Sequence, residues 1–108
     1  MGLSSIVGKC SSLAVFEHRN STEDYKELVF FNRDLQEWQK VLEQELGPAV
    51  KPAGKKPSAE DKEITENFGG VHANQTLFRK RTPAGTVIAM FWPWDDKEHV
   101  TLKLVLCK

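Results

Sequence analysis

The run FWPWDD at residues 91–96 has the richest side-chain chemistry in this 108-residue sequence. Trp92 and Trp94 lie two residues apart, so a turn at Pro93 would present two aromatic rings beside carboxylates. Tryptophan is enriched at interfaces, where its ring buries a large area and its N–H still finds an acceptor. We therefore predict a binding surface made of Phe91, Trp92, Trp94 and Asp95. The alternative is purely structural, with a strand that ends at Pro93 and a hairpin loop after it.

Metal ligation is a second chemistry that this region suggests. Asp95, Asp96, Glu98 and His99 are close in sequence, and carboxylate oxygens and imidazole nitrogens bind hard cations and transition metals. Their spacing matches neither a calcium loop nor a zinc signature. We therefore interpret them as solvated hairpin charges and expect no metal.

His72 is the one candidate for acid–base catalysis. It follows Gly69 and Gly70 and lies near Asn74, so it could serve as a general acid or base in a pocket at the end of a helix. A hydrogen-bonded structural histidine is the alternative. Because the chain has no nucleophile elbow, phosphate loop, zinc-protease motif or dinucleotide fingerprint, we expect no cofactor and favour a non-catalytic protein over an enzyme.

Basic residues suggest a third function, the binding of single-stranded RNA. Arg79, Lys80 and Arg81 follow Phe78, which could stack on a base, and three lysines lie in the run 48–57. However, fifteen basic residues balance fifteen acidic ones, and neither ribonucleoprotein motif is present. Nucleic acid is thus disfavoured as a partner, and protective charges at a sheet edge explain the cluster as well.

The bulk properties indicate one folded domain over residues 1–108, with 40% hydrophobic and 28% charged residues. We expect residues 1–10 to form a loose N-terminal arm. Residues 1–16 lack a basic start and an apolar core for export, which predicts a cytoplasmic protein with no membrane association. Cys10 and Cys107 lie near opposite ends of the chain, which predicts reduced, inert thiols.

Two helices are predicted in the middle of the chain. The first begins with Asn32 as its N-cap, carries one apolar stripe, and ends at Gly47 and Pro48. Ser58 and Asp61 form a capping box for the second, which ends at Gly69 and Gly70. The apolar stripe of the first helix consists of Leu35, Trp38, Leu42 and Leu46. Between the helices, residues 48–57 contain three prolines and three lysines, which predicts an exposed connector.

Five strands complete the prediction. Each run is rich in branched or aromatic residues and is bounded by turn-forming residues. The runs are 12–18, 25–31, 75–81, 86–92 and 98–106. The order ββααβββ predicts an α+β fold, in which an antiparallel sheet carries both helices on one face.

The strand at 86–92 is apolar on both sides, because Ile88, Met90 and Trp92 alternate with other apolar residues. Two helices on one face cannot cover both sides, so the second face needs a cover. A loop or the N-terminal arm, a partner subunit, or a small apolar ligand could provide it. We therefore expect a binding or interaction module, with a homodimer as one alternative, that uses this face and the hairpin of Trp92 and Trp94. An enzyme with a pocket near His72 is the runner-up.

Overall fold

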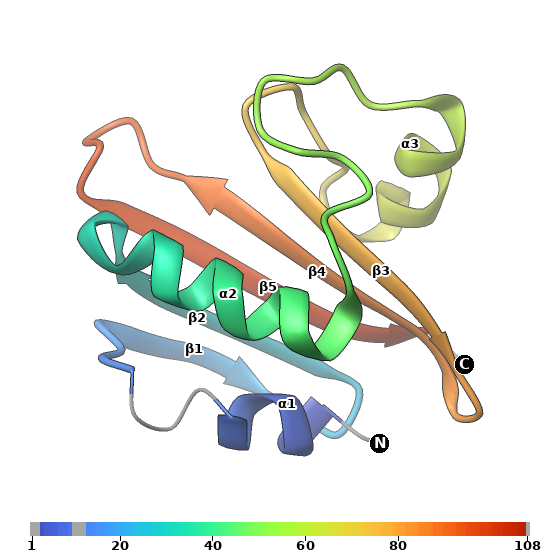
Figure 1. Ribbon diagram of the computed structural model, residues 1–108, viewed down its shortest axis with the longest axis horizontal. Coiled ribbons are helices and arrows are strands. Elements are labelled where there is room, and N and C mark those ends of the chain that lie inside the picture. Colours follow the sequence, from blue (N-terminus) through green and yellow to red (C-terminus); the bar gives the residue numbers. More distant parts are fainter. Residues whose placement is uncertain (1–2, 10–12, 108) are drawn as a thin grey trace.

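The computed structural model describes residues 3–9 and 13–107, and it confirms an α+β fold built on a five-stranded sheet (Figure 1). All four strand pairings are antiparallel, and the spatial order is β1-β2-β5-β4-β3. The strands are β1 Glu17–Ser21, β2 Tyr25–Phe31, β3 Thr76–Thr82, β4 Gly85–Pro93 and β5 His99–Cys107.

Helices connect and cover these strands. They are α1 Leu3–Lys9, α2 Leu35–Leu46 and α3 Ala59–Thr65, with the short 3-10 helices η1 Asn32–Asp34 and η2 Glu66–Phe68. Within the described ranges, no helix has the length and apolar character that a membrane crossing requires.

The first face of the sheet is covered by α2, which crosses in front of the strands in Figure 1. Trp38, Leu42 and Leu46 of the predicted stripe are buried there. The Trp38 ring stacks on Phe30 of β2 with 4.7 Å between ring centroids. Full burial of one such side chain contributes about 1.5–3 kcal/mol to folding, so this stripe fixes the helix on the sheet. Asn32 is not the N-cap, because η1 comes between β2 and α2.

The N-terminal segment belongs to the same core. Residues 1–10 were expected to be a loose arm, but Leu3–Lys9 forms α1, and Leu3 and Ile6 are fully buried against the first face. This short segment has no clear helical stripe in its sequence. Burial against the sheet therefore stabilises a helix that local pattern alone did not predict.

The second face is covered by the α3–η2 segment, which corrects the prediction that both helices share one face. Ile64 and Phe68 pack with Ile88 and Met90, whereas Phe91, the next residue of β4, packs in the core beneath α2. Because successive strand residues point to opposite faces, α2 and α3 must lie on opposite sides of the sheet. The capping box that starts α3 is present as predicted.

The central strand β4 is buried on both faces, as its sequence predicts. Val87, Ile88, Ala89, Met90 and Phe91 are each at most 1% exposed. The chain itself provides the cover on both sides. A partner subunit is therefore not needed to shield this strand.

The first strand lies further along the chain than predicted. β1 spans Glu17–Ser21 instead of 12–18, and all five of its residues are exposed. An edge strand that is solvated on both sides carries no alternating apolar signal. The apolar residues Leu13 and Val15 precede it and pack against the core instead.

The connector between α2 and α3 is mostly exposed, with Ala49 and Pro57 half-buried and Lys51 buried. Lys51 is fully buried, and its backbone pairs with Leu77 at the start of edge strand β3. Its Nζ donates to the carbonyl oxygens of Pro52 and Ala73, at 3.1 Å each, and to that of Gln75. Burial lowers the pKa of the Lys51 ammonium. These three carbonyls replace the water that the ammonium loses, so Lys51 ties the connector to the sheet.

Candidate functional site

The hairpin between β4 and β5 places Trp92 and Trp94 on the second face of the sheet, near the end of β4. Pro93 separates them, so the two rings point to the same side of the strand. Both side chains are half-buried. The two rings nevertheless have different surroundings.

Trp94 is held in a fixed orientation. Its Nε1 donates to Oγ1 of Thr101 over 2.8 Å, and its ring lies 4.8 Å from that of His99, centroid to centroid. The guanidinium carbon of Arg19 lies 5.2 Å from the centroid of the indole ring. Since Thr101 and its cross-strand partner Val29 are buried, Trp94 and Arg19 help to cover the sheet where α3 does not reach.

Four aromatic rings form a cluster at this end of the sheet, which we call the ring cluster. Phe16 lies 5.4 Å from Phe31 and 4.5 Å from His99, and Phe31 lies 5.5 Å from His99, measured between centroids. Phe16 is 49% exposed, which is the largest value for any bulky apolar side chain in the described ranges. The ring cluster consists of Phe16, Phe31, Trp94 and His99.

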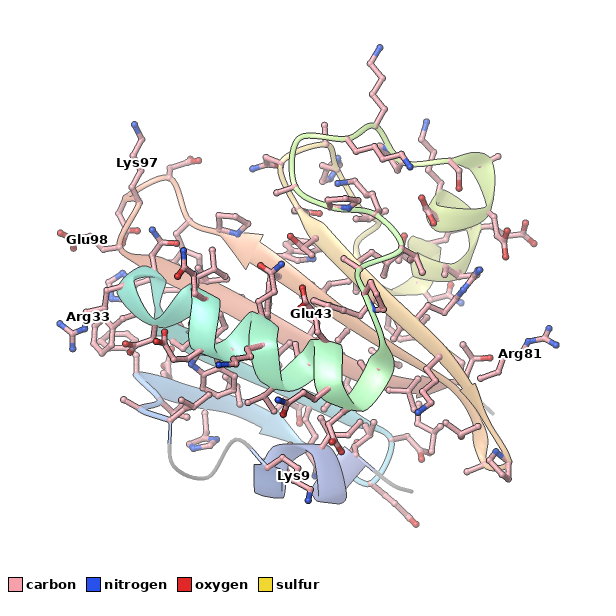
Figure 2. The ribbon with its side chains drawn as sticks, viewed as in Figure 1. Lys9, Arg33, Glu43, Arg81, Lys97 and Glu98 are labelled. Atoms are coloured by element: carbon pink, nitrogen blue, oxygen red, sulfur yellow. The ribbon has the colours of Figure 1, made fainter. Side chains whose placement is uncertain are left out.

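Two arginines flank the ring cluster. The guanidinium carbon of Arg33 lies 4.6 Å from the centroid of Phe31, and Arg19 stacks on Trp94 at the other side. Arg19 forms an ion pair with Glu17 at 3.1 Å. In the part of the chain that the structure describes, Arg33 has no carboxylate partner. Figure 2 shows Arg33 at the same end of the molecule as Glu98 and Lys97, opposite Arg81.

The hairpin turn itself is organised by Asp96. Its Oδ1 accepts from the backbone N–H groups of Glu98 and His99 at 2.8 and 3.1 Å, and its Oδ2 lies 2.6 Å from Nδ1 of His99. These bonds lower the pKa of the Asp96 carboxyl. Asp96, Glu98 and His99 place potential ligand atoms within 4.8 Å of one another. Because Asp96 and His99 already bond each other and the backbone, the turn explains this grouping without a metal.

Trp92 lies in a second, separate setting. The ammonium of Lys103 sits 3.6 Å from the centroid of its ring and donates to the carbonyl oxygen of Phe68 at 3.1 Å. The ring also packs against Gly69. Burial lowers the pKa of Lys103. Trp92 therefore joins η2 to the sheet.

Two other predicted binding residues have different positions. Phe91 is 1% exposed and faces the core beneath α2, so it cannot contact a partner, and the prediction is wrong for this residue. Asp95 is exposed on the hairpin, next to Trp94.

The side chain of His72 is exposed, and its ring is 6.4 Å from that of Trp92. Its backbone N–H donates to Oε1 of Gln75, which shapes the turn before β3. His72 is not among the described residues that line the three best-formed cavities.

The basic cluster lacks its stacking ring. Phe78 is fully buried in the core, so it cannot stack on a base, and Arg79 forms an ion pair with Glu60 of α3.

Burial raises the pKa of the Cys107 thiol, which disfavours the reactive thiolate. Cys10 lies outside the described residues.

Sequence reasoning missed half of the ring cluster and both arginines. Phe16 and Phe31 belong to runs that read as strands, and nothing local brings them to the Trp94 hairpin. Phe31 reaches the hairpin because β2 pairs antiparallel with β5, which sets Phe31 opposite His99.

Comparison of this chain with protein-family models, curated protein sequences and solved structures found no significant match. The site must therefore be interpreted from its own chemistry.

Proposed function

We propose that this domain is a non-catalytic binding module whose contact surface is the ring cluster together with Arg19 and Arg33. One observation carries the proposal. Phe16, a large apolar side chain, is half exposed beside the rings of Phe31 and His99, which come from two other segments. Exposed aromatic groups of this kind are typical of protein contact sites.

The rigidity of the surface supports this function. The bond from Trp94 to Thr101 and the bond between Asp96 and His99 fix two of the four rings before any partner arrives. A preorganised surface loses less side-chain entropy on binding than a mobile one. Tryptophan and arginine are also the residue types that most often dominate binding energy at interfaces.

The chemistry of the surface indicates the partner. Arg33 presents a guanidinium without a carboxylate partner in the described structure, and it lies over Phe31 beside the exposed ring of Phe16. A protein segment with an apolar side chain next to a carboxylate would fill both positions. We propose such a segment on another protein as the partner, and a cytoplasmic location for the complex.

A second copy of this chain is the alternative occupant of the surface. A homodimer is not needed to cover the second sheet face, because α3, η2 and Trp94 provide that cover within one chain. An enzyme at His72 and RNA binding at Arg79 to Arg81 find less support, since His72 is exposed and Phe78 is buried.

The experiment is a selection of peptides from a random library on the purified domain. We expect selected peptides to combine aromatic or aliphatic residues with Asp or Glu. Their affinity should fall about tenfold or more for Trp94→Ala and for Arg33→Ala. Val50→Ala is the matched control, because Val50 is an exposed apolar residue beside β3, at the edge of the sheet opposite β1.

Two results would contradict this function. Selected peptides that bind all three variants equally would place the contact surface elsewhere. Sedimentation equilibrium could also show concentration-dependent dimerisation that Trp94→Ala abolishes. This result would mean that the surface binds a second copy of this chain and not a segment of another protein.

A further inference from the structure

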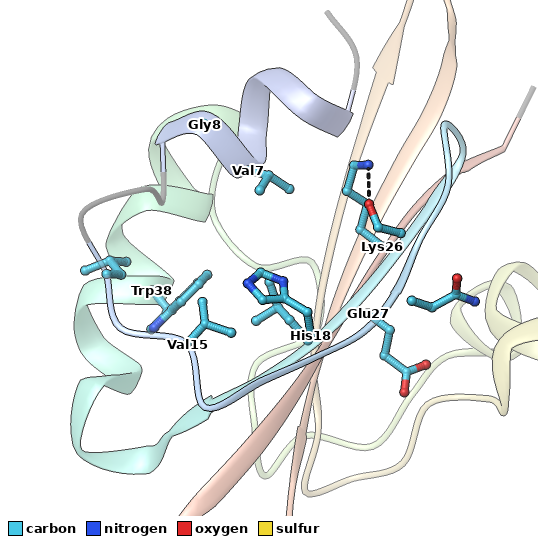
Figure 3. A pocket seen from close by; sticks show the side chains of 11 residues that line it. Val7, Gly8, Val15, His18, Lys26, Glu27 and Trp38 are labelled. Atoms are coloured by element: carbon cyan, nitrogen blue, oxygen red, sulfur yellow. Dashed lines mark hydrogen bonds between the residues drawn. The ribbon is translucent and has the colours of Figure 1, made fainter.

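A pocket of about 580 Å³ opens on the first face of the sheet, away from the ring cluster, between α1, α2 and the β1–β2 hairpin (Figure 3). This volume lies in the range of small-molecule sites, roughly 300–1,000 Å³. Its apolar wall comes from five side chains on separate segments. They are Val7, Leu13, Val15, Leu28 and Trp38.

Trp38 forms the most buried part of this wall. Its side chain is 1% exposed and is held against Phe30. Its Nε1 is itself enclosed, so the ring offers the pocket apolar surface and not a hydrogen-bond donor. The contact between this ring and a ligand is therefore apolar.

The rim of the pocket carries a hydrogen-bond donor. Nζ of Lys26 donates to Oγ of Ser21 at 3.0 Å and to the carbonyl oxygen of Thr22 at 2.9 Å. An ammonium has three N–H donors, so one is left for a further acceptor. His18 also lines the pocket, and Figure 3 shows its ring directed toward Val7.

Among the described residues that line the pocket, Glu27 is the one acidic residue. Its carboxylate bonds the hydroxyl of Tyr25 and lies 3.9 Å from Arg19, so it does not pair with Lys26. Figure 3 shows the Glu27 side chain directed away from the pocket. The side chains at the pocket thus combine an apolar wall with a cationic, donor-rich rim.

We propose that this pocket binds a small carboxylic acid with an apolar body, such as a medium-chain fatty acid. The hydrocarbon chain lies against Leu28 and Trp38, and the carboxylate accepts from Lys26. This site is independent of the ring cluster, so it stands whether or not the proposed partner surface is correct.

The test is an NMR titration of the full chain with decanoate, read at the three tryptophan indole N–H signals. These signals are assigned with Trp92→Phe and Trp94→Phe. We expect the Trp38 signal to shift with saturation, while that of Trp94, which is bonded to Thr101, stays in place. Decyltrimethylammonium, with the same chain and a cationic head, should bind at least about tenfold more weakly.

Two variants localise the binding. Lys26→Met keeps the aliphatic stem but removes the ammonium, so it should weaken decanoate about five- to tenfold. Lys40→Met, at an exposed position on α2, is the matched control and should bind as wild type does. Both positions lie outside the core, so the variants should fold, and circular dichroism checks this.

Three outcomes would overturn the proposal. The first is no shift of the Trp38 signal at millimolar decanoate. The second is equal affinity for the anionic and cationic probes, and the third is equal affinity of Lys26→Met and Lys40→Met for decanoate.

Discussion

Gly69 and Trp92 lie so close that a side chain at residue 69 would collide with the indole ring. A Cβ built on Gly69 would lie 2.5 Å from Cη2 of Trp92, and Gly69 also has a φ of +95°. Both the backbone conformation and the space therefore require glycine. This contact seats η2 on the second face of the sheet.

Gly69→Ala should destabilise the domain by about 3 kcal/mol, because the left-handed backbone costs about 1–2 kcal/mol and the collision adds a similar amount. Urea unfolding measures the loss. Gly54→Ala is the matched control, since its φ is +90° but nothing lies within 4 Å of a Cβ there. Equal losses for the two variants would mean that the contact with Trp92 does not restrict residue 69.

Lys51→Met should lower the free energy of unfolding by about 3 kcal/mol, since it leaves three carbonyl oxygens without their donor. Lys55→Met, at an exposed position in the same connector, should change it by less than about 0.5 kcal/mol. Chemical denaturation of both variants measures the difference. If the two variants unfold at the same urea concentration, the hydrogen bonds of Lys51 do not stabilise the packing of the connector against β3.

Tyr25 should ionise only at strongly alkaline pH. Burial, and then the hydrogen bond to Glu27, raise the pKa of its phenol well above the ordinary value of 10.0. The stability linked to this group is therefore fully present below pH 10 and is lost as the pH rises toward the folded-state pKa. Tyr25 is the single tyrosine of the chain, so ultraviolet absorbance of tyrosinate reports it directly. Glu27→Gln should lower the pKa, and an unchanged titration would contradict the role of Glu27.

Thr101→Val should destabilise the domain by about 1 kcal/mol and speed the exchange of the Trp94 indole hydrogen, because it removes the acceptor of Trp94. Hydrogen exchange followed by NMR measures the second effect. Thr86→Val, at a half-buried position of β4, is the control. Exchange at the wild-type rate in Thr101→Val would show that the ring is held by packing alone.

The sequence determined those features whose signals are local. The capping box of Ser58 and Asp61 forms within one turn, and the stripe of α2 depends on helical spacing alone. The two-sided apolar pattern of β4 predicted its burial on both faces, because side-chain direction alternates along any strand. The fold class followed from the order of the predicted strands and helices along the chain.

Only the tertiary structure decided what depends on contacts between distant segments. The narrow stripe of Ile64 and Phe68 fits either face of a sheet, so the side on which α3 packs was not encoded locally. The ring cluster forms because β2 pairs with β5, which brings Phe31 opposite His99. These two residues are sixty-eight positions apart, and no local pattern in the sequence indicates their contact. In the sequence, Lys51 cannot be distinguished from a solvated lysine. Its burial depends on the carbonyl oxygens of Ala73 and Gln75, which lie on another loop. These contacts depend on how the whole domain packs, so a short segment of the sequence is not enough to predict them.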